Sequence, residues 1–448
     1  MSRTHDLTNG SVVKKLVVFT LPIFFVNLLQ ALYNLVDLAI VGHFTDPVGM
    51  AAVNNGGQVT NMVLLICMGL ANGCTVYIGQ LYGAGKTAEI KRVIGSFLSF
   101  ILLMALALTA AAGIFLHPLL DALNTPPESM EETARYLMIC MGGTVFIYSY
   151  NVMSAALRGV GESFMPMIFV VISTAENFLL DLLFVAVLHW NSVGAAAATV
   201  LSQLTSCILA ALYIKKKTDL FDFRPSSFRI DREKLGTVLR IGLPQSLQFT
   251  CTTISFLFIT ALINTYGVDA AAAAGVTLKV GNFGLLAGTS FMSALMTFTA
   301  QNLPGGHYKR IIKGMITGML LALTLSGTMF ILCHTMPDKI YRLFTDSAGV
   351  AALGIPFLGW YSICFFDEVI MFCMFGVLTG AGYTLVTMCC SLFSAFGIRY
   401  AAAYLLSICT FLGFNGIALA YALSPLLGLS ISLYFLLSGK WKKSRVKV

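Results

Sequence analysis

The stretch that decides the fold runs from Leu16 to Val41 and reads LVVFTLPIFFVNLLQALYNLVDLAIV. Crossing the hydrocarbon core of a bilayer takes one helix of about 20 mostly apolar residues. The apolar core of a cleavable secretion signal is much shorter, and this run also contains Pro22 and Asp37. We therefore interpret it as the first membrane span.

The composition extends this interpretation to the whole chain. Of the 448 residues, 57% are hydrophobic and 11% are charged, and the mean hydropathy is +0.84. Soluble domains are usually about 45–50% apolar and about 25% charged. An ordinary soluble enzyme is therefore excluded, and the lipid bilayer is the expected solvent. The eleven cysteines lie mostly alone inside apolar runs, which predicts buried thiols rather than a metal site or a disulfide framework.

Charges and Pro/Gly clusters divide the chain into twelve apolar runs that are long enough to span a bilayer. Strands of a closed barrel would be about ten residues long and would alternate in polarity, so the spans are predicted to be helices. They are expected near residues 16–42, 53–82, 93–116, 136–157, 164–188, 193–214, 236–264, 271–301, 311–333, 351–378, 384–408 and 414–437.

The basic residues predict the orientation, because Lys and Arg in short loops stay in the cytoplasm. The outside loops would hold only Arg135, Lys339 and Arg342, and the spans hold Lys279 and Arg399. The other 23 of the 28 basic residues then lie in cytoplasmic segments. Both termini are therefore predicted to be cytoplasmic, in a multi-pass protein of the plasma membrane.

The two halves of the sequence repeat each other at a separation of about 221 residues. Leu21-Pro22 aligns with Leu243-Pro244, and Gly159-Val160-Gly161 aligns with Gly380-Ala381-Gly382. Six spans in each half make the repeats parallel. We therefore predict an all-α membrane protein with twelve helices in two six-helix lobes, related by a pseudo-two-fold axis along the membrane normal. The predicted parts are an N-lobe (1–214), a cytoplasmic interlobe loop (215–235) and a C-lobe with a basic tail (236–448).

Seven ionisable residues inside the spans are the first functional candidates, because charge in a membrane interior is costly and is usually retained for function. They are Asp37, Glu176, Asp181, Lys279, Asp367, Glu368 and Arg399. Helical spacing places Asn27, Gln30, Asn34 and Asp37 on one face, with Tyr33 beside them. Similar stripes include Thr174, Asn177 and Asp181 in the fifth span, and Thr199, Ser202, Gln203 and Ser206 in the sixth.

These stripes predict a polar pocket in the N-lobe. Hydrogen bonding between helices explains isolated hydroxyls equally well, but it explains the two carboxylates poorly. We assign cation or proton coupling to Asp37, Asn177, Asp181 and Thr199, whose oxygen ligands suit a proton or Na⁺. The sequence leaves H⁺ and Na⁺ both open, and it predicts no other metal. The substrate cavity is assigned to Gln30, Tyr33, Asn34, Gln248 and Glu368.

The C-lobe differs, because its acids Asp367 and Glu368 are neighbours in the tenth span and basic residues are available. One acid is expected to pair with Lys279 or Arg399 as structure, while the other faces the cavity. We assign Lys279, Asp367 and Arg399 to ion pairing. Pro22 and Pro244 are candidate bend points of the lobe-initial spans.

Three other functions are disfavoured. Acids interleave the basic cluster at 215–240, so no nucleic acid partner is expected. The sequence GQLYGAGKT at 79–87 has Gln80 where a phosphate-binding loop needs its first glycine. The chain contains no hydrolase motif of the His-Glu-x-x-His or Gly-x-Ser-x-Gly type. We therefore predict neither an enzyme nor a bound cofactor.

Several of these residues together resemble the multidrug and toxic compound extrusion (MATE) family. The resemblance is carried by Leu21-Pro22 through Tyr33-Asn34-Leu35-Val36-Asp37 to Val41-Gly42, by Gly79-Gln80 with Gly83-Ala84, by Arg158 to Ser163, and by Asn177 to Asp181. It covers essentially the whole chain. It implies that Asp37, Asn177, Asp181 and Thr199 occupy the family's N-lobe coupling site. The seventh span lacks the acid typical of the NorM branch, so the chain looks closer to the DinF-like branch.

The leading hypothesis is a monomeric secondary antiporter that exports organic cations or amphipathic drugs in exchange for H⁺ or Na⁺, by alternating access. A first alternative is a flippase for lipid-linked saccharides of the same superfamily. Anionic head groups would favour a basic cavity, whereas the spans hold five acids and two bases. A second alternative, a channel or receptor, would not need the internal duplication.

Overall fold

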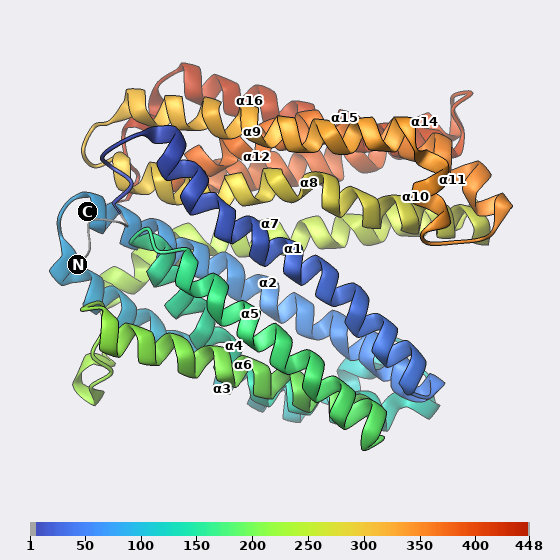
Figure 1. The fold of residues 1–448 in the computed structure, drawn as a ribbon, viewed down its shortest axis with the longest axis horizontal. Coiled ribbons are helices and arrows are strands. Elements are labelled where there is room, and N and C mark those ends of the chain that lie inside the picture. Colours follow the sequence, from blue (N-terminus) through green and yellow to red (C-terminus); the bar gives the residue numbers. More distant parts are fainter. Residues whose placement is uncertain (1–5, 447–448) are drawn as a thin grey trace. The chain divides into compact units, whose positions relative to one another are not determined.

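The computed structural model describes residues 6–446, apart from the side chains of residues 34–43. Every regular element in this part of the chain is a helix (Figure 1). The helices of the first half are α1 (Val12–Phe44), α2 (Pro47–Gly83), α3 (Thr87–Ala122), α4 (Pro127–Gly159), α5 (Phe164–Asp181), η2 (Leu182–Val187), α6 (Asn191–Lys217) and η3 (Pro225–Ser227). Those of the second half are α7 (Arg232–Asn264), α8 (Val268–Asn302), α9 (Tyr308–Thr335), α10 (Pro337–Arg342), α11 (Ala348–Tyr361), α12 (Cys364–Gly380), α13 (Thr384–Leu392), η4 (Phe393–Arg399), α14 (Tyr400–Ile408), α15 (Phe414–Leu423), α16 (Pro425–Leu437) and η5 (Lys440–Lys442).

The number of spans agrees with the sequence. Eleven helical segments of the described chain are long and apolar enough to cross a membrane, and α11 with α12, which meet at a bend of 41°, make a twelfth when the pair is counted as one span. The all-helical prediction is confirmed, and the predicted span at 351–378 is this bent pair. Several helices extend beyond their apolar runs. Thr87–Ala122, for example, exceeds the predicted 93–116, because a helix can continue past the hydrocarbon region.

Side-chain caps and glycines in the left-handed conformation explain where some of these helices begin and end. The Asp46 side chain accepts a hydrogen bond from the Gly49 backbone N–H at 2.6 Å, which caps the start of α2 just before Pro47. Left-handed backbone at Gly85 (φ +74°) follows α2, and Gly306 (φ +69°) follows α8 in the same way. Glycine adopts this conformation without steric cost. The two halves therefore end a corresponding helix by the same device.

The chain divides into two compact units. The first helix of each half, α1 or α7, belongs partly to one unit and partly to the other. Unit 1 contains Phe25–Ser246, and unit 2 contains Leu7–Phe24 with Leu247–Val448. The two cuts come just after Pro22 in α1 and Pro244 in α7. The lobes 1–214 and 236–448 and the loop 215–235 are bounded differently and remain a prediction. The roles of Pro22 and Pro244 as bend points also remain predictions, since α1 and α7 each continue through their proline.

Each unit has its own helix packing. In unit 1, α4 packs against α2, α3 and α6, and α5 packs against α6. In unit 2, α8 packs against α9, α11 and α12, and α12 also packs against α16 (Figure 1). Large aromatic side chains, including Phe357, Tyr361, Phe365 and Tyr421, fill part of the unit 2 core.

Glycines bring α2 and the first part of α7 unusually close together within unit 1. A Cβ at Gly69 would lie 2.3 Å from the Ser246 backbone nitrogen, and one at Gly73 would lie 2.6 Å from the Val238 carbonyl oxygen. The Ser246 hydroxyl uses this proximity to donate a hydrogen bond to the Ile66 carbonyl oxygen at 2.7 Å. Small residues let membrane helices approach in this way. The contact between α2 and α7 therefore depends on Gly69 and Gly73 having no side chain.

Candidate functional site

The fifth span is built so that one polar face is buried. Glu162 caps α5, because its carboxylate accepts hydrogen bonds from the backbone N–H groups of Phe164 (2.9 Å) and Met165 (3.1 Å). From there Ser173, Asn177 and Asp181 recur every four residues, and all three are buried. The capped helix thus presents a column of polar groups toward its neighbours rather than toward lipid.

Asp181 is the centre of this column. It is the last residue of α5, its exposed fraction is 0%, and one of its carboxylate oxygens accepts a hydrogen bond from the Tyr33 hydroxyl of α1 at 3.3 Å. The π-helical turn η2 begins at the next residue. Such wide turns occur frequently at functional sites because they shift side chains by one position. The structure therefore brings Tyr33, predicted for the substrate cavity, into contact with Asp181, predicted for coupling.

Asn177 lies one turn before Asp181, and it has unmet hydrogen-bonding capacity. Its side-chain nitrogen is buried and finds no hydrogen-bond partner among the described residues. A buried N–H donor without a partner is unfavourable, so it suits a bound water or an acceptor atom of a substrate. Thr199 is half-buried on α6, which packs against α5, and its carbonyl oxygen accepts a hydrogen bond from the Ser202 hydroxyl at 2.9 Å.

The remaining predicted residues of the first span are only partly placed. The side chains of Asn34 and Asp37 lie outside the described residues. Gln30 is exposed. The coupling role of Asp37 and the cavity roles of Gln30 and Asn34 remain predictions.

One acid of unit 1 received no role from the sequence. Glu176 precedes Asn177 on α5, is half-buried, and accepts a hydrogen bond from the Thr205 hydroxyl of α6 at 3.0 Å. Its presence in an apolar run was visible in the sequence. Its partner was not, because the contact depends on how α5 meets α6.

In unit 2 one acid faces Arg399, as expected, but it is Glu368 and not Asp367. Arg399 faces Glu368, with 3.9 Å between a guanidinium nitrogen and a carboxylate oxygen, and both side chains are buried. Asp367 instead accepts a hydrogen bond from the Glu368 backbone N–H at 2.8 Å. Adjacent residues of a helix point about 100° apart, so only one of the two acids can meet Arg399. Glu368, which was assigned to the substrate cavity, is therefore the acid that pairs with Arg399.

Lys279 also differs from its assignment. It is exposed on α8, and it takes part in no ion pair in the described part of the chain. The face of α8 that meets α11 and α12 is marked instead by Gly281 and Gly284, which lie against the rings of Tyr361 and Phe365. Gln248 is buried in α7, and its side-chain oxygen has no partner among the described residues. Its predicted cavity role remains a prediction.

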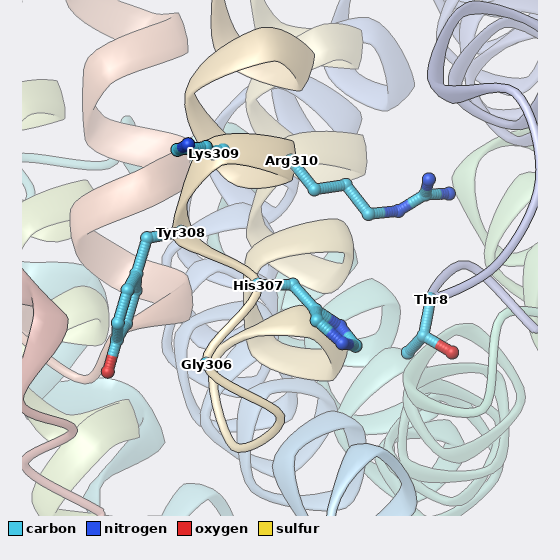
Figure 2. A pocket seen from close by; sticks show the side chains of 6 residues that line it. All are labelled: Thr8, Gly306, His307, Tyr308, Lys309 and Arg310. Carbon is cyan, nitrogen blue, oxygen red and sulfur yellow. The ribbon is translucent and has the colours of Figure 1, made fainter.

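A pocket of about 400 Å³ lies where α8 passes into α9, and none of these acids lines it. Thr8 and Gly306 to Arg310 line it (Figure 2). Figure 2 shows Arg310 extending toward the segment of Thr8, and its guanidinium donates hydrogen bonds to the carbonyl oxygens of Leu7, Asn9 and Gly10. This arrangement fastens the N-terminal segment to unit 2. We read it as structural, since the guanidinium is used within the chain.

The sequence of this chain matches a known protein family. The sequence model of the family described as MatE matches the chain twice, over residues 22–183 and 244–405. Both ends of the two matches are separated by 222 residues, which agrees with the predicted internal repeat.

Relatives match over most of their length. A Bacillus subtilis protein described as "Probable multidrug resistance protein YoeA" is 27% identical over 348 residues, or 76% of this chain and 75% of that protein. A Thermotoga maritima protein described as "Probable multidrug resistance protein NorM" is 24% identical over 445 residues, or 97% and 94% of the two chains. A solved outward-facing structure of a multidrug resistance MATE family transporter covers 99% of both chains, with a TM-score of 0.93 and 21% identity. At that identity the structural likeness establishes the fold.

Proposed function

The chain belongs to the MatE family of membrane transporters, and on that premise we propose that it exports cationic or amphipathic small molecules in exchange for H⁺ or Na⁺. The exchange proceeds by alternating access, in a monomer of the plasma membrane with both termini in the cytoplasm. The names of the relatives, which refer to multidrug resistance, support this substrate class.

The observation that carries the proposal is the burial of Asp181 within a span. Its carboxylate is fully buried, and Tyr33 and Asn177 supply polar groups beside it. Burying a carboxylate is costly unless the charge is balanced or removed, so ionisable groups inside membranes usually mark ion and substrate pathways. A proton, a sodium ion or a cationic substrate can each balance it.

Coupling then follows because the coupling ion and the cationic substrate compete for the negative charge of Asp181. While Asp181 is ionised, it accepts the hydrogen bond of the Tyr33 hydroxyl and supplies a counter-charge to a cationic substrate. When a proton binds the carboxylate, that counter-charge is lost and the substrate is released. Sodium would act in the same way, held by oxygen ligands of Asp181, Asn177 and Thr199. Each elementary charge that enters down a 100 mV potential supplies about 2.3 kcal/mol.

Purified protein in liposomes tests the proposal. An ethidium-like fluorescent cation is loaded, and export is driven first by a pH gradient in Na⁺-free buffer and then by a Na⁺ gradient at equal pH. We expect one of the two gradients to drive export and to be dissipated by the substrate. Export that is indifferent to both gradients would contradict antiport. Translocation of a lipid-linked saccharide in place of the drug would support the flippase alternative.

A further inference from the structure

A buried ion pair in unit 2, together with two aromatic rings beside it, draws on four helical elements and has no part in the proposed coupling. Arg399 ends the π-helical turn η4 and is 4% exposed. Its guanidinium faces Glu368 of α12 at 3.9 Å. A charge-assisted hydrogen bond between such groups would measure about 2.7–2.9 Å. The carboxylate therefore attracts the guanidinium without being bonded closely to it.

Other groups, rather than Glu368 alone, hold the guanidinium in place. The rings of Phe256 in α7 and Tyr421 in α15 each have their centroid 5.2 Å from its central carbon. The Nε–H group donates a hydrogen bond to the Ser424 hydroxyl at 3.0 Å. Aromatic rings attract cations through their negative faces, and a pair of rings with a nearby acid is how proteins hold organic cations. This is the chemistry of a ligand site.

The fit of the arginine to this site is incomplete. A terminal guanidinium nitrogen of Arg399 and the Tyr421 hydroxyl are both buried, and neither has a hydrogen-bond partner among the described residues. A side chain retained only for structural ion pairing would be expected to satisfy these donors, because unmet buried groups are costly. The groups around the Arg399 guanidinium therefore suit planar cations in general, and not only a guanidinium that is attached to the chain.

The internal repeat shows that this cation is peculiar to unit 2. Gly194 packs against Phe184, and Gly416 packs against Leu406, which sets the offset between the halves at this level to 222 residues. At that offset Arg399 corresponds to Asn177. Unit 2 thus carries a permanent cation at the position where unit 1 carries a neutral amide with unmet hydrogen bonds.

The residue one turn later differs as well. Ala403 of unit 2 corresponds to Asp181 of unit 1, and the acid of unit 2 is supplied by Glu368 from another helix. Unit 1 therefore carries its acid on the helix itself, whereas unit 2 carries its acid on α12, facing the arginine of η4.

We propose that unit 2 contains a site for a planar organic cation of the guanidinium class, formed by Glu368, Phe256, Tyr421 and Ser424, and that the chain occupies it with its own Arg399. While Arg399 is present, no exchangeable cation binds there. Removing the arginine side chain opens the site to a free guanidinium ion. This inference does not depend on the proposed export.

The test uses the purified full-length chain and methylguanidinium as the probe. Arg399→Ala is expected to gain a saturable thermal stabilisation of about 3 °C at tens of millimolar methylguanidinium, because a ligand that binds only the folded state raises its stability. The wild type should gain none, since its site is full. Lys279→Ala, which removes an exposed cation of the same unit, is the matched control and should also gain none.

The double variant Arg399→Ala with Glu368→Gln decides whether the site is the one proposed. It should lose the methylguanidinium effect, because the carboxylate is gone. If Arg399→Ala does not fold, Arg399→Gln, whose amide can still bond to Ser424, takes its place with the same expected results. A folded single variant without saturable stabilisation overturns the proposal, as does equal stabilisation in the wild type or the double variant.

Discussion

Asp181 is the residue on which the proposed coupling depends most directly. Asp181→Asn keeps the size of the side chain and removes its charge, so the competition between ion and substrate is lost. We expect gradient-driven export to fall by at least about tenfold in liposomes, because hydrogen bonds and contacts to a charged group carry about 1.5–3 kcal/mol. Asp121→Asn, which changes an exposed acid at the end of α3, is the matched control and should export normally.

Tyr33→Phe separates the hydrogen bond from the charge. It removes only the hydroxyl that donates to Asp181. We expect export to persist with a shifted pH or Na⁺ dependence, because the carboxylate remains but loses one stabilising donor. The measurement is the export rate as a function of pH or Na⁺ concentration. A profile identical to that of the wild type would show that the contact has no part in coupling.

Sequence spacing predicts which residues share a helix face, but it does not predict which residues meet across helices. Asn177 and Asp181 were expected on one face of the fifth span, and the structure buries both. The contact of Tyr33 with Asp181 depends on how α1 meets α5. The pairing of Arg399 with Glu368 depends likewise on how a π-helical turn orients Arg399 toward α12. No periodicity contains that information.

At the scale of elements, the approach of α2 to α7 depends on glycine. Gly69→Ala would place a Cβ 2.3 Å from the Ser246 backbone nitrogen, so one helix must move. Overpacking of this kind typically costs about 1–3 kcal/mol. We expect a lower melting temperature in detergent. Gly57→Ala in the same helix, where a Cβ would meet nothing within 4 Å, is the matched control and should leave stability unchanged or slightly raised.

The segment between α6 and α7 gives a prediction about pH. Hydrogen bonds from Lys91 (2.6 Å) and Ser227 (2.6 Å) hold the pKa of Asp222 below its usual range. A depressed carboxyl pKa stabilises the folded segment above the free value of 3.8, and this contribution is lost as the pH falls through the lower folded value. The segment should therefore stay docked from pH 8 to pH 5 and loosen only in strong acid.

A spin label at Ser226→Cys measures this docking. Ser226 is exposed, so the label should not disturb the segment. We expect constant mobility of the label down to about pH 4 and greater mobility below it. Adding Asp222→Asn should make the label mobile at every pH. A rise in mobility near neutral pH would show that another group controls the segment.

Hydropathy predicted that the spans exist but not how they are interrupted. The runs at 164–188 and 384–408 gave no sign of the π-helical turns η2 and η4, because one extra residue in a turn leaves the average hydropathy unchanged. The bend between α11 and α12 was invisible as well, because a change of helix direction does not alter hydropathy. These interruptions lie next to Asp181, Arg399 and Glu368, so the sequence predicted the elements better than the site.

At the scale of the whole molecule, the distribution of basic residues and the repeat made the fold predictable. Lys and Arg concentrate in alternate loops, and the family model matches the chain twice. Neither observation needs any knowledge of side-chain contacts. This is why the count of spans came from the sequence alone. The side of the membrane on which each loop lies is measured by labelling.

Cys409 offers that measurement without a new label site. It is the exposed cysteine of the chain and follows α14, in a loop that a cytoplasmic N-terminus and twelve spans place outside the cell. A membrane-impermeant maleimide should therefore label the wild type on intact cells. Replacing Cys409 with Ser and Ser226 with Cys moves the exposed thiol to the segment between the repeats, and labelling should then require permeabilised cells. The reverse pattern would invert the topology, and with it the direction in which the proposed exchange moves its substrate.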